Sequence, residues 1–340
     1  MIPPNTQARR RPTMGDVAAE AGVSLKTVSR VVNAEKHVSA HVTARVRQVI
    51  SELGYLPDRR ARELAGQRTS GRLIGFVQVD AANPFFAAVS RGLEDVTREH
   101  GLVIITGSTD GRPDREATLI ETLVEFRAEG LVVAAAEGSD ALLHREIERG
   151  TPVVCVDRLL PDVHCDTVVS SNRESTRAAV DHLRAIGHHR IAFLGGDQRV
   201  WTARERLAGY REAVPAPDPA LEIVDVGDVE RAAAATRRLF DAPVPPTALF
   251  TAQDRITTGV VTALHALGRQ HDVALFGFDE IPFSEQLDPP VAVVAQDPYE
   301  MGRRAGDLLL ARLSGGIRQP ARVVVDAALR HRRSGDIRPC

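Results

Sequence analysis

Cysteine is scarce in this sequence, and long apolar runs are missing. The 340 residues include three cysteines, at positions 155, 165 and 340, which is too few for a disulfide-based secreted scaffold and fits a reducing cytoplasm. A membrane-spanning helix needs about 18 consecutive apolar residues, and the sequence contains no such run. The first twelve residues are polar, include an arginine run at 9–11 and lack the apolar centre of a signal peptide. These absences predict a cytoplasmic protein that is neither exported nor embedded in a membrane.

The motifs that carry most enzymatic chemistry are missing as well. The first predicted strand leads into residues 83–86, without the glycine pattern of a dinucleotide-binding loop or the lysine of a phosphate-binding loop. No Ser-His-Asp arrangement stands out, and Cys165 beside His164 lacks further ligands at metal spacing. A second group of histidines is more typical of a surface helix end than of a site: His182, His188 and His189. The sequence therefore disfavours an enzyme, a metal centre and a bound cofactor.

Charge is distributed unevenly along the chain. Residues 1–70 hold twelve of the 43 lysines and arginines but only six of the 45 aspartates and glutamates, a balance of +6. The remaining residues hold 31 lysines and arginines and 39 aspartates and glutamates, a balance of −8. Any single arginine is most simply a solvated surface charge. A basic N-terminal segment followed by an acidic remainder is nevertheless typical of a protein whose N-terminal segment binds the phosphates of nucleic acid.

Two short helices joined by a tight turn are predicted near the N-terminus. Thr13, followed three residues later by Asp16, has the spacing of a capping box that starts the first helix. Gly22 ends this helix, because glycine adopts the positive φ of a tight turn at little cost. Ser24 is the predicted cap of the second helix. The apolar stripe of that helix consists of Val28, Val31 and Val32. This is a helix-turn-helix pattern, in which the first residues of the second helix face the major groove of DNA.

A third helix is predicted between Ser39 as its cap and Gly54 at its end. Beyond Pro57, residues 58–66 contain three arginines and enough chain for about two helical turns. Because so short a helix is marginal on its own in water, we expect it to order only on a partner subunit and on DNA. Leu64 would then wedge into the minor groove.

From residue 72 the pattern changes to short apolar runs that alternate with amphipathic segments. The predicted strands are residues 73–79, 103–106, 130–135, 152–156, 191–194, 247–251 and 273–276. The predicted helices are residues 85–100, 115–127, 173–186, 204–213, 231–240 and 255–267. This alternation favours parallel sheets with helices on both faces. Because about 260 residues are too many for one such sheet, we predict two similar subdomains, with crossings near 169–172, Gln296 and Val325.

Ligands of open α/β sheets bind beyond the carboxyl ends of the strands. The predicted loops at these ends carry aromatic rings, carboxylates, an amide and an arginine. Such groups bind small polyhydroxylated or heterocyclic molecules. These residues are Asp80, Phe85, Phe86, Asp157, Trp201, Thr202, Arg206, Gln253, Asp254 and Asp279. Phe85 and Phe86 are equally consistent with ordinary core residues, and Asp157 or Asp254 with helix caps.

Four segments of the sequence carry a specific resemblance to a known family, namely residues 16–33, 38–39, 54–57 and 61–66. They resemble the DNA-binding headpiece and hinge of the LacI/GalR family, the lactose- and purine-repressor-like transcription regulators. The resemblance continues more loosely to about residue 333. It implies an N-terminal all-α helix-turn-helix headpiece and an α/β, periplasmic-binding-protein-like core of two doubly wound parallel-sheet subdomains.

The domain boundaries that we expect follow this pattern. They are a disordered tail at 1–12, a helix-turn-helix domain at 13–57, a hinge helix and linker at 58–70, and the core at 71–340. Within the core, the first subdomain would comprise residues 71–170 and 297–325. The second would comprise residues 171–296 and 326–335.

The resemblance also assigns roles to individual residues. Those expected to contact DNA are Thr13, Ser24, Leu25, Lys26, Thr27, Ser29, Arg30, Asn33, Tyr55, Arg59, Ala61 and Leu64. The equivalents of Arg206 and Asp279 reach the effector in the family. Matches at further positions also imply pocket roles, namely those at Phe85, Phe86, Asp157, Thr202 and Gln253. Many members carry an aromatic residue where this chain has Val229, after Gly227-Asp228, so Trp201 is the candidate for a replacement sugar-stacking face.

The function implied by the resemblance is sequence-specific transcriptional regulation, as a repressor controlled by a small-molecule effector such as a sugar or related metabolite. The expected partners are near-palindromic operator DNA, the effector, and further copies of the chain in a homodimer or tetramer, with no membrane. One alternative is a solute-binding receptor without a DNA role, against which the headpiece and the missing signal peptide argue. Another is a Rossmann-type dehydrogenase or kinase, against which the missing motifs argue.

Overall fold

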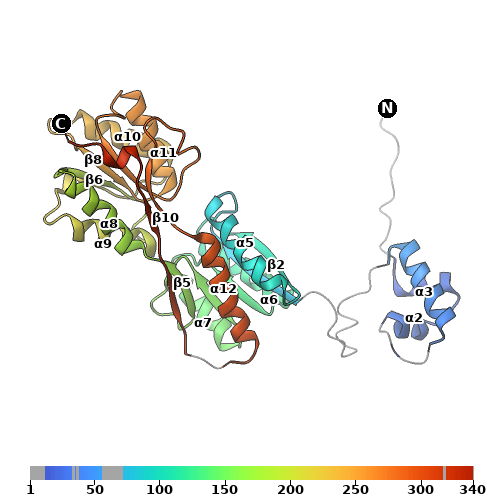
Figure 1. The fold of residues 1–340 in the computed structure, drawn as a ribbon. Helices are drawn as coiled ribbons and strands as arrows, with labels where there is room; N and C mark the ends of the chain where they lie inside the picture. Colours follow the sequence, from blue (N-terminus) through green and yellow to red (C-terminus); the bar gives the residue numbers. More distant parts are fainter. Residues whose placement is uncertain (1–11, 33–34, 36–37, 56–71, 317–318, 340) are drawn as a thin grey trace, which may run out of the picture. The chain divides into compact units, whose positions relative to one another are not determined.

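The computed structural model describes residues 12–32, 35, 38–55, 72–316 and 319–339 (Figure 1). The chain divides into two compact units, Met1–Gly71 and Arg72–Cys340. The first unit contains the predicted headpiece, and the second contains both predicted sheets. Each unit is described by itself below.

The first unit contains three helices, α1 (Met14–Ala21), α2 (Leu25–Val32) and α3 (Ala40–Leu53). The predicted capping box is confirmed, because the Asp16 amide donates to Thr13 Oγ1 at 3.3 Å and the Thr13 amide donates to Asp16 Oδ2 at 2.6 Å. Gly22 has a φ of 64°, as predicted for the turn between α1 and α2. One side of each helix is buried in a shared core, which includes Val17, Val28, Val46 and Tyr55.

The first sheet of the core has six parallel strands in the order β11-β5-β4-β3-β1-β2. The strands are β1 (Arg72–Gln78), β2 (Leu102–Ser108), β3 (Gly130–Val133), β4 (Val153–Val156), β5 (Asp166–Ser170) and β11 (Arg322–Val325). Its helices are α5 (Pro84–Arg98), α6 (Pro113–Glu125), α7 (Asp140–Glu148) and α12 (Pro298–Leu313). The interior is a pair of apolar clusters built from both faces of the sheet, as expected for a sheet covered on both sides.

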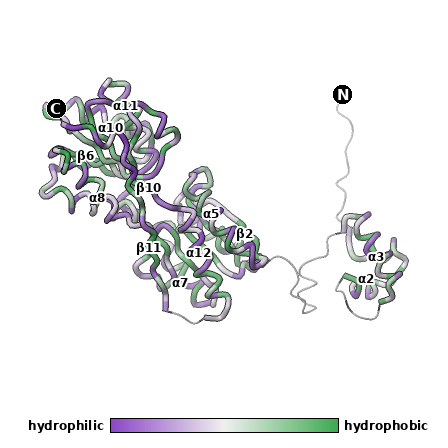
Figure 2. Tube along the Cα trace, viewed as in Figure 1, coloured by the Kyte–Doolittle hydropathy of each residue, from purple (hydrophilic) through white to green (hydrophobic). Residues whose placement is uncertain are grey.

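The second sheet has the order β12-β10-β9-β8-β6-β7. Its strands are β6 (Ile191–Leu194), β7 (Glu222–Ile223), β8 (Ala248–Thr251), β9 (Ala274–Phe278), β10 (Ala292–Ala295) and β12 (Ala328–Arg330), the last antiparallel to β10. Its helices are α8 (Asn172–Ala185), α9 (Trp201–Ala213), α10 (Val229–Asp241) and α11 (Asp254–Ala266), with short 3-10 turns at Pro219–Leu221 and Arg333–Asp336. In Figure 2 the colouring alternates between hydrophobic and hydrophilic along helices such as α10 and α11, as amphipathic helices require.

The two sheets share the order of five parallel strands and differ at the sixth, since β11 is parallel to β5 whereas β12 is antiparallel to β10. In this shared order, β4 and β5 of the first sheet occupy the positions of β9 and β10 of the second. The chain passes between them three times: from β5 to α8, from β10 to α12, and from β11 to β12 (Figure 1). The predicted class of fold, a helical headpiece with two parallel-sheet subdomains, is confirmed. The sequence analysis did not predict helices α7 and α12 or strands β5, β7, β10, β11 and β12.

Candidate DNA-reading helix and candidate effector site

Helix α2 presents polar residues and one leucine on the side away from the headpiece core. Val28 and Val31 are buried, whereas Leu25 is 57% exposed and Lys26 is also exposed. Ser24 caps the helix, because its Oγ accepts from the Thr27 amide at 3.2 Å. An exposed leucine at the start of this helix is suited to contact an apolar group such as a thymine methyl.

Other predicted DNA contacts have different surroundings. The Arg30 guanidinium lies 3.8 Å from the Glu35 carboxylate, and both side chains are more than 40% exposed, so the pair is weak and exchangeable. Ser29 is half-buried on the same helix. The Thr13 hydroxyl serves the capping box, where it donates to Asp16 Oδ2 at 2.6 Å. The Tyr55 ring is 6% exposed and completes the small headpiece core, and its contact with DNA stays a prediction.

Several predicted DNA contacts lie outside the described residues. They are Asn33, Arg59, Ala61 and Leu64, together with the whole predicted hinge helix at residues 58–66.

The candidate effector site of the second subdomain is centred on Arg206. This residue lies on α9 and is 4% exposed. Its Nε donates to Asn172 Oδ1 and its Nη1 donates to the Ala252 carbonyl, each at 2.7 Å. The guanidinium carbon lies 3.6 Å from the centre of the Phe278 ring, a cation–π contact. Burial lowers the pKa of Arg206, although neighbouring carboxylates oppose this. The guanidinium is therefore held in one orientation before any ligand binds.

Asp279 follows β9 directly and has a φ of 72°. One Asp279 oxygen, Oδ2, lies 3.8 Å from Arg206 Nη1, and the other, Oδ1, accepts from Gln296 Nε2 at 2.7 Å. Burial raises the pKa of Asp279 to about 6, and the opposing effects of Arg206 and Gln296 do not cancel this rise. The side chain is still 24% exposed, so a ligand can reach it.

Asp157 occupies the equivalent place in the first subdomain, directly after β4, with a φ of 71°. Its amide donates to the Val168 carbonyl of β5, as the Asp279 amide donates to the Val294 carbonyl of β10. Burial raises the pKa of Asp157, while Arg158 and Arg206 act in the opposite direction. Asp157 starts a loop rather than a helix, so the alternative of a helix cap is wrong.

Arg158 and Glu116 fix the backbone beside Asp157. Arg158 Nη1 donates to the Ala135 carbonyl at 2.9 Å, and the buried Glu116 accepts from the Ala136 amide at 2.6 Å. Burial raises the pKa of Glu116. Two charged side chains thus hold adjacent peptide groups just beyond β3, next to the loop that begins at Asp157.

The remaining predicted residues divide between the candidate site and the core. Gln253 is the residue before α11, and its amide group packs against Gly196, where an added Cβ would lie 2.9 Å from Gln253 Oε1. Asp254 is the first residue of α11, and its charge acts on Arg206. Phe85 is half-buried, whereas Phe86 is 5% exposed and packs in the core of the first sheet. The role of Phe86 in the pocket stays a prediction.

Trp201 and Thr202 were predicted in a loop, but they are the first two residues of α9 and both are buried. The Arg322 guanidinium of β11 lies 5.8 Å from the centre of the Trp201 ring. Val229, the position where family members carry an aromatic residue, is the first residue of α10, and Asp228 caps that helix.

The sequence analysis missed two residues that orient the site. Asn172 follows β5 and positions Arg206, whereas Gln296 follows β10 and positions Asp279. Both stand at carboxyl ends of strands, which is the signal that identified the other residues. They were missed because neither strand was predicted.

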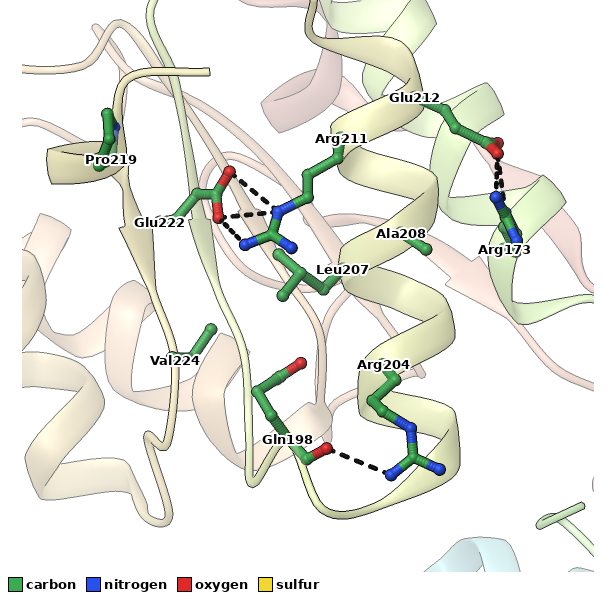
Figure 3. Close-up of a pocket in the computed structure, with 10 residues that line it drawn as sticks. All are labelled: Arg173, Gln198, Arg204, Leu207, Ala208, Arg211, Glu212, Pro219, Glu222 and Val224. Atoms are coloured by element: carbon green, nitrogen blue, oxygen red, sulfur yellow. Dashed lines mark hydrogen bonds and ion pairs between the residues drawn. The ribbon is translucent and has the colours of Figure 1, made fainter. Parts of the chain in front are cut away.

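A separate cavity of about 810 Å³ opens on the outer face of α9 (Figure 3). Its lining is Arg173, Gln198, Arg204, Leu207, Ala208, Arg211, Glu212, Pro219, Glu222 and Val224, which includes no residue of the predicted effector set. Arg173 pairs with Glu212 and Arg211 with Glu222, while Arg204 donates to the carbonyls of Gln198 and Arg199. Four of its five charged side chains are already paired within the protein, and Arg204 is bonded to backbone carbonyls, so this cavity is a weaker candidate than the Arg206 site.

Comparisons with known proteins agree with the two-part reading of the chain. Residues 13–58 match the family described as bacterial regulatory proteins, lacI family, and residues 180–335 match the periplasmic binding protein-like domain. The HTH-type transcriptional regulator CelR of Thermobifida fusca is 34% identical over 342 residues, covering 97% of this chain and all of that protein.

Two solved structures extend this similarity. The lac repressor dimer bound to operator and the anti-inducer ONPF gives a TM-score of 0.78 at 27% identity, over 96% of this chain and 99% of that one. The complex of the transcriptional regulator CelR with cellobiose gives a TM-score of 0.69 at 32% identity, over 95% of this chain and 100% of that one. Among the described residues, no helix is both long and apolar enough to cross a membrane. The chain therefore belongs to the LacI family of bacterial regulatory proteins and is a helix-turn-helix, DNA-binding transcriptional regulator.

Proposed function

We propose that this regulator is a repressor whose affinity for operator DNA is set by a neutral, hydroxyl-rich effector bound at Arg206, Asp279 and Asp157. The observation that carries the proposal is the fixed Arg206 guanidinium with carboxylates facing it. Asp279, Asp157 and Asp254 all act electrostatically on this one arginine. The local balance is negative, which disfavours an anionic ligand.

Hydroxyl groups suit this arrangement chemically. A carboxylate only accepts hydrogen bonds and a guanidinium only donates them, whereas a hydroxyl does both. A sugar presents several adjacent hydroxyls, so it can bridge Arg206 and the aspartates at once. The cellobiose complex of the similar regulator CelR supports this class of ligand. Aromatic stacking at Val229 is not available to this chain, and Phe85, Trp201, Thr202 and Gln253 are the further proposed contacts.

We propose that the operator is read by Leu25, Lys26, Ser29 and Arg30, supported by Ser24 and Thr27 at the start of α2. One such helix reads few base pairs, so specific binding requires two headpieces on a near-palindromic site and hence a homodimer. The structure of the similar lac repressor dimer on operator supports this arrangement.

Calorimetry with a panel of mono- and disaccharides tests the effector site. A sugar that binds the wild-type chain should bind Arg206→Ala at least about 30-fold more weakly, because about 2 kcal/mol or more is lost with a buried, charge-assisted contact. Arg204→Ala is the matched control, since Arg204 lies on the same helix, is exposed and lines the outer cavity. Equal sugar affinity in Arg206→Ala and the wild type would place the effector elsewhere. Loss in Arg204→Ala alone would point to the cavity of Figure 3.

A further inference from the structure

Three side chains with metal-binding chemistry meet on the second subdomain, away from Arg206. They are His182 in the last turn of α8, His331 directly after β12, and Asp336 at the end of the last 3-10 turn. The nitrogen and oxygen atoms that they offer all lie within 4.8 Å of one another. His182 and Asp336 are 154 positions apart in the sequence, so the fold creates this group.

The contacts of His182 define the centre of the group. Its Nε2 lies 3.0 Å from Asp336 Oδ1 and 3.1 Å from the Gly335 carbonyl. The His331 ring lies 4.5 Å from the His182 ring, at an interplanar angle of 68°. The Phe276 ring contacts both imidazoles edge to face, at 6.2 and 5.9 Å, and so forms an apolar wall behind them. Two imidazoles and a carboxylate thus converge beside one aromatic ring.

The nearby His188 has a purely structural role, which contrasts with the group at His182. His188 is fully buried, with Nδ1 2.9 Å from Thr247 Oγ1 and Nε2 2.8 Å from the Ile337 carbonyl, so both ring nitrogens are satisfied by the protein. His331 and Asp336, in contrast, are exposed and reachable from solvent.

We propose that His182, His331 and Asp336 form a binding site for a zinc-class divalent transition metal, with water as a fourth ligand. Zinc takes imidazole nitrogen and carboxylate oxygen at about 2.0–2.2 Å, so tetrahedral ligands lie about 3.4 Å apart. The observed separations reach that value through side-chain adjustments of about 1.5 Å or less. Imidazole ligands select zinc, copper or nickel over magnesium and calcium. The metal would replace the proton on His182 Nε2 and tie the C-terminal segment to α8.

The test is thermal unfolding and calorimetry of the full, tag-free chain with zinc chloride. One zinc per chain should bind at this site, and a tenfold excess over its dissociation constant should raise the unfolding midpoint by about 3–6 °C. His331→Gln and Asp336→Asn should lose this rise while keeping the wild-type midpoint without zinc, because both side chains are exposed. His189→Gln, an exposed histidine just beyond the same helix, should keep the rise. Undiminished stabilisation in His331→Gln and Asp336→Asn, or an equal effect of magnesium chloride, overturns the proposal.

Cobalt spectroscopy separates this site from the pair of thiols in the first subdomain, Cys155 and Cys165, whose sulfur atoms lie 3.3 Å apart. Cobalt bound by two imidazoles and a carboxylate should show visible d–d bands without a thiolate-to-metal charge-transfer band. These bands should disappear in His331→Gln and persist in Cys155→Ser. A thiolate band that is lost in Cys155→Ser would assign the metal to the cysteines instead.

Discussion

Arg206 and the carboxylates around it illustrate how single residues set the chemistry of the candidate site. The arginine has two fixed hydrogen-bond partners and an aromatic face, so it is oriented in the absence of ligand. The carboxyl group of Asp279 has a pKa of about 6 because burial disfavours its charge. Such an unfavourable buried charge is typical of a site kept for binding rather than for stability.

Asp279→Asn should therefore stabilise the core in a pH-dependent way. A carboxyl group whose folded pKa is raised favours the folded state only while protonated, so the wild type loses stability as pH rises from about 4 to about 6. A pKa rise of about two units corresponds to about 3 kcal/mol at most, and the variant should recover about 1–3 kcal/mol at pH 8. Urea unfolding at pH 4 and pH 8 measures this. A variant that is equally stable to the wild type at pH 8, or more stabilised at pH 4 than at pH 8, would contradict the assignment.

Lys26 allows a residue-scale test of DNA reading, because Lys26 and Lys36 are the only lysines in the sequence. Lys26 is exposed near the start of α2. If it enters the major groove, operator DNA should reduce its acetylation by an amine-reactive reagent about tenfold or more, as measured by mass spectrometry. A control duplex of scrambled sequence at equal concentration should protect it less. Equal modification of Lys26 with and without operator would show that this helix face does not meet the DNA.

At the scale of helices and strands, the sequence predicted the elements that have strong local signals. The capping box at Thr13, the turn at Gly22 and the strand–helix alternation all depend on neighbouring residues, and these predictions are confirmed. Strands β5 and β10 were missed because apolar runs of four or five residues do not distinguish a strand from buried helix or loop. Because these two strands were not predicted, Asn172 and Gln296 at their carboxyl ends were not identified as site residues. Their roles depend on the pairing of strands far apart in sequence.

Helix α12 was missed for a different reason, because Gly302 and Gly306 lower its intrinsic helix propensity by about 1 kcal/mol each. The structure explains Gly302 through the close packing of α12 on α5. An added Cβ at Gly302 would collide with the Val89 carbonyl, and one at Gly92 would collide with the Tyr299 carbonyl. These two glycines let the helix backbones approach each other.

Gly92→Ala and Gly302→Ala should each lower the free energy of unfolding by about 2 kcal/mol or more, because a rigid backbone carbonyl occupies the space. Gly306→Ala is the matched control on the same helix. Its Cβ would lie 3.2–3.3 Å from side-chain atoms of Val96 and Leu93, which can shift. The propensity gain of about 1 kcal/mol should offset most of that strain. Chemical denaturation would count against this packing account if all three variants lost equal stability.

At the scale of the whole core, the two sheets share the order of five parallel strands and place Asp157 and Asp279 at equivalent strand ends. An ion pair joins the two subdomains directly, since Arg255 Nη2, in the first turn of α11, donates to Asp80 Oδ2 in the loop after β1 at 2.7 Å. These side chains are 56% and 32% exposed, so the pair contributes less than about 1 kcal/mol. It can adjust the arrangement of the subdomains but does not fix it.

Arg255→Gln should accordingly change effector affinity by less than about fivefold, the factor that corresponds to 1 kcal/mol. Arg206→Ala should exceed this effect by a wide margin, because Arg206 is buried and meets the ligand directly in our account. Calorimetry on both variants under one set of conditions makes the comparison. A larger loss in Arg255→Gln than in Arg206→Ala would show that subdomain closure, rather than direct contact, dominates affinity.

The central claim is that occupancy of the Arg206 site changes how tightly the headpieces hold operator DNA. A ligand does this only through its different affinities for the two arrangements of the core, and the coupling is reciprocal. The most direct measurement is the operator dissociation constant at fixed salt, with and without a saturating sugar identified by calorimetry, for the wild type and Arg206→Ala. For a coupling of about 1–3 kcal/mol, the wild-type constant should change roughly 5–150-fold in either direction. Arg206→Ala should change less than about twofold at the same sugar concentration. A wild-type operator affinity that stays constant while the sugar is bound, or an undiminished response in Arg206→Ala, would contradict the account.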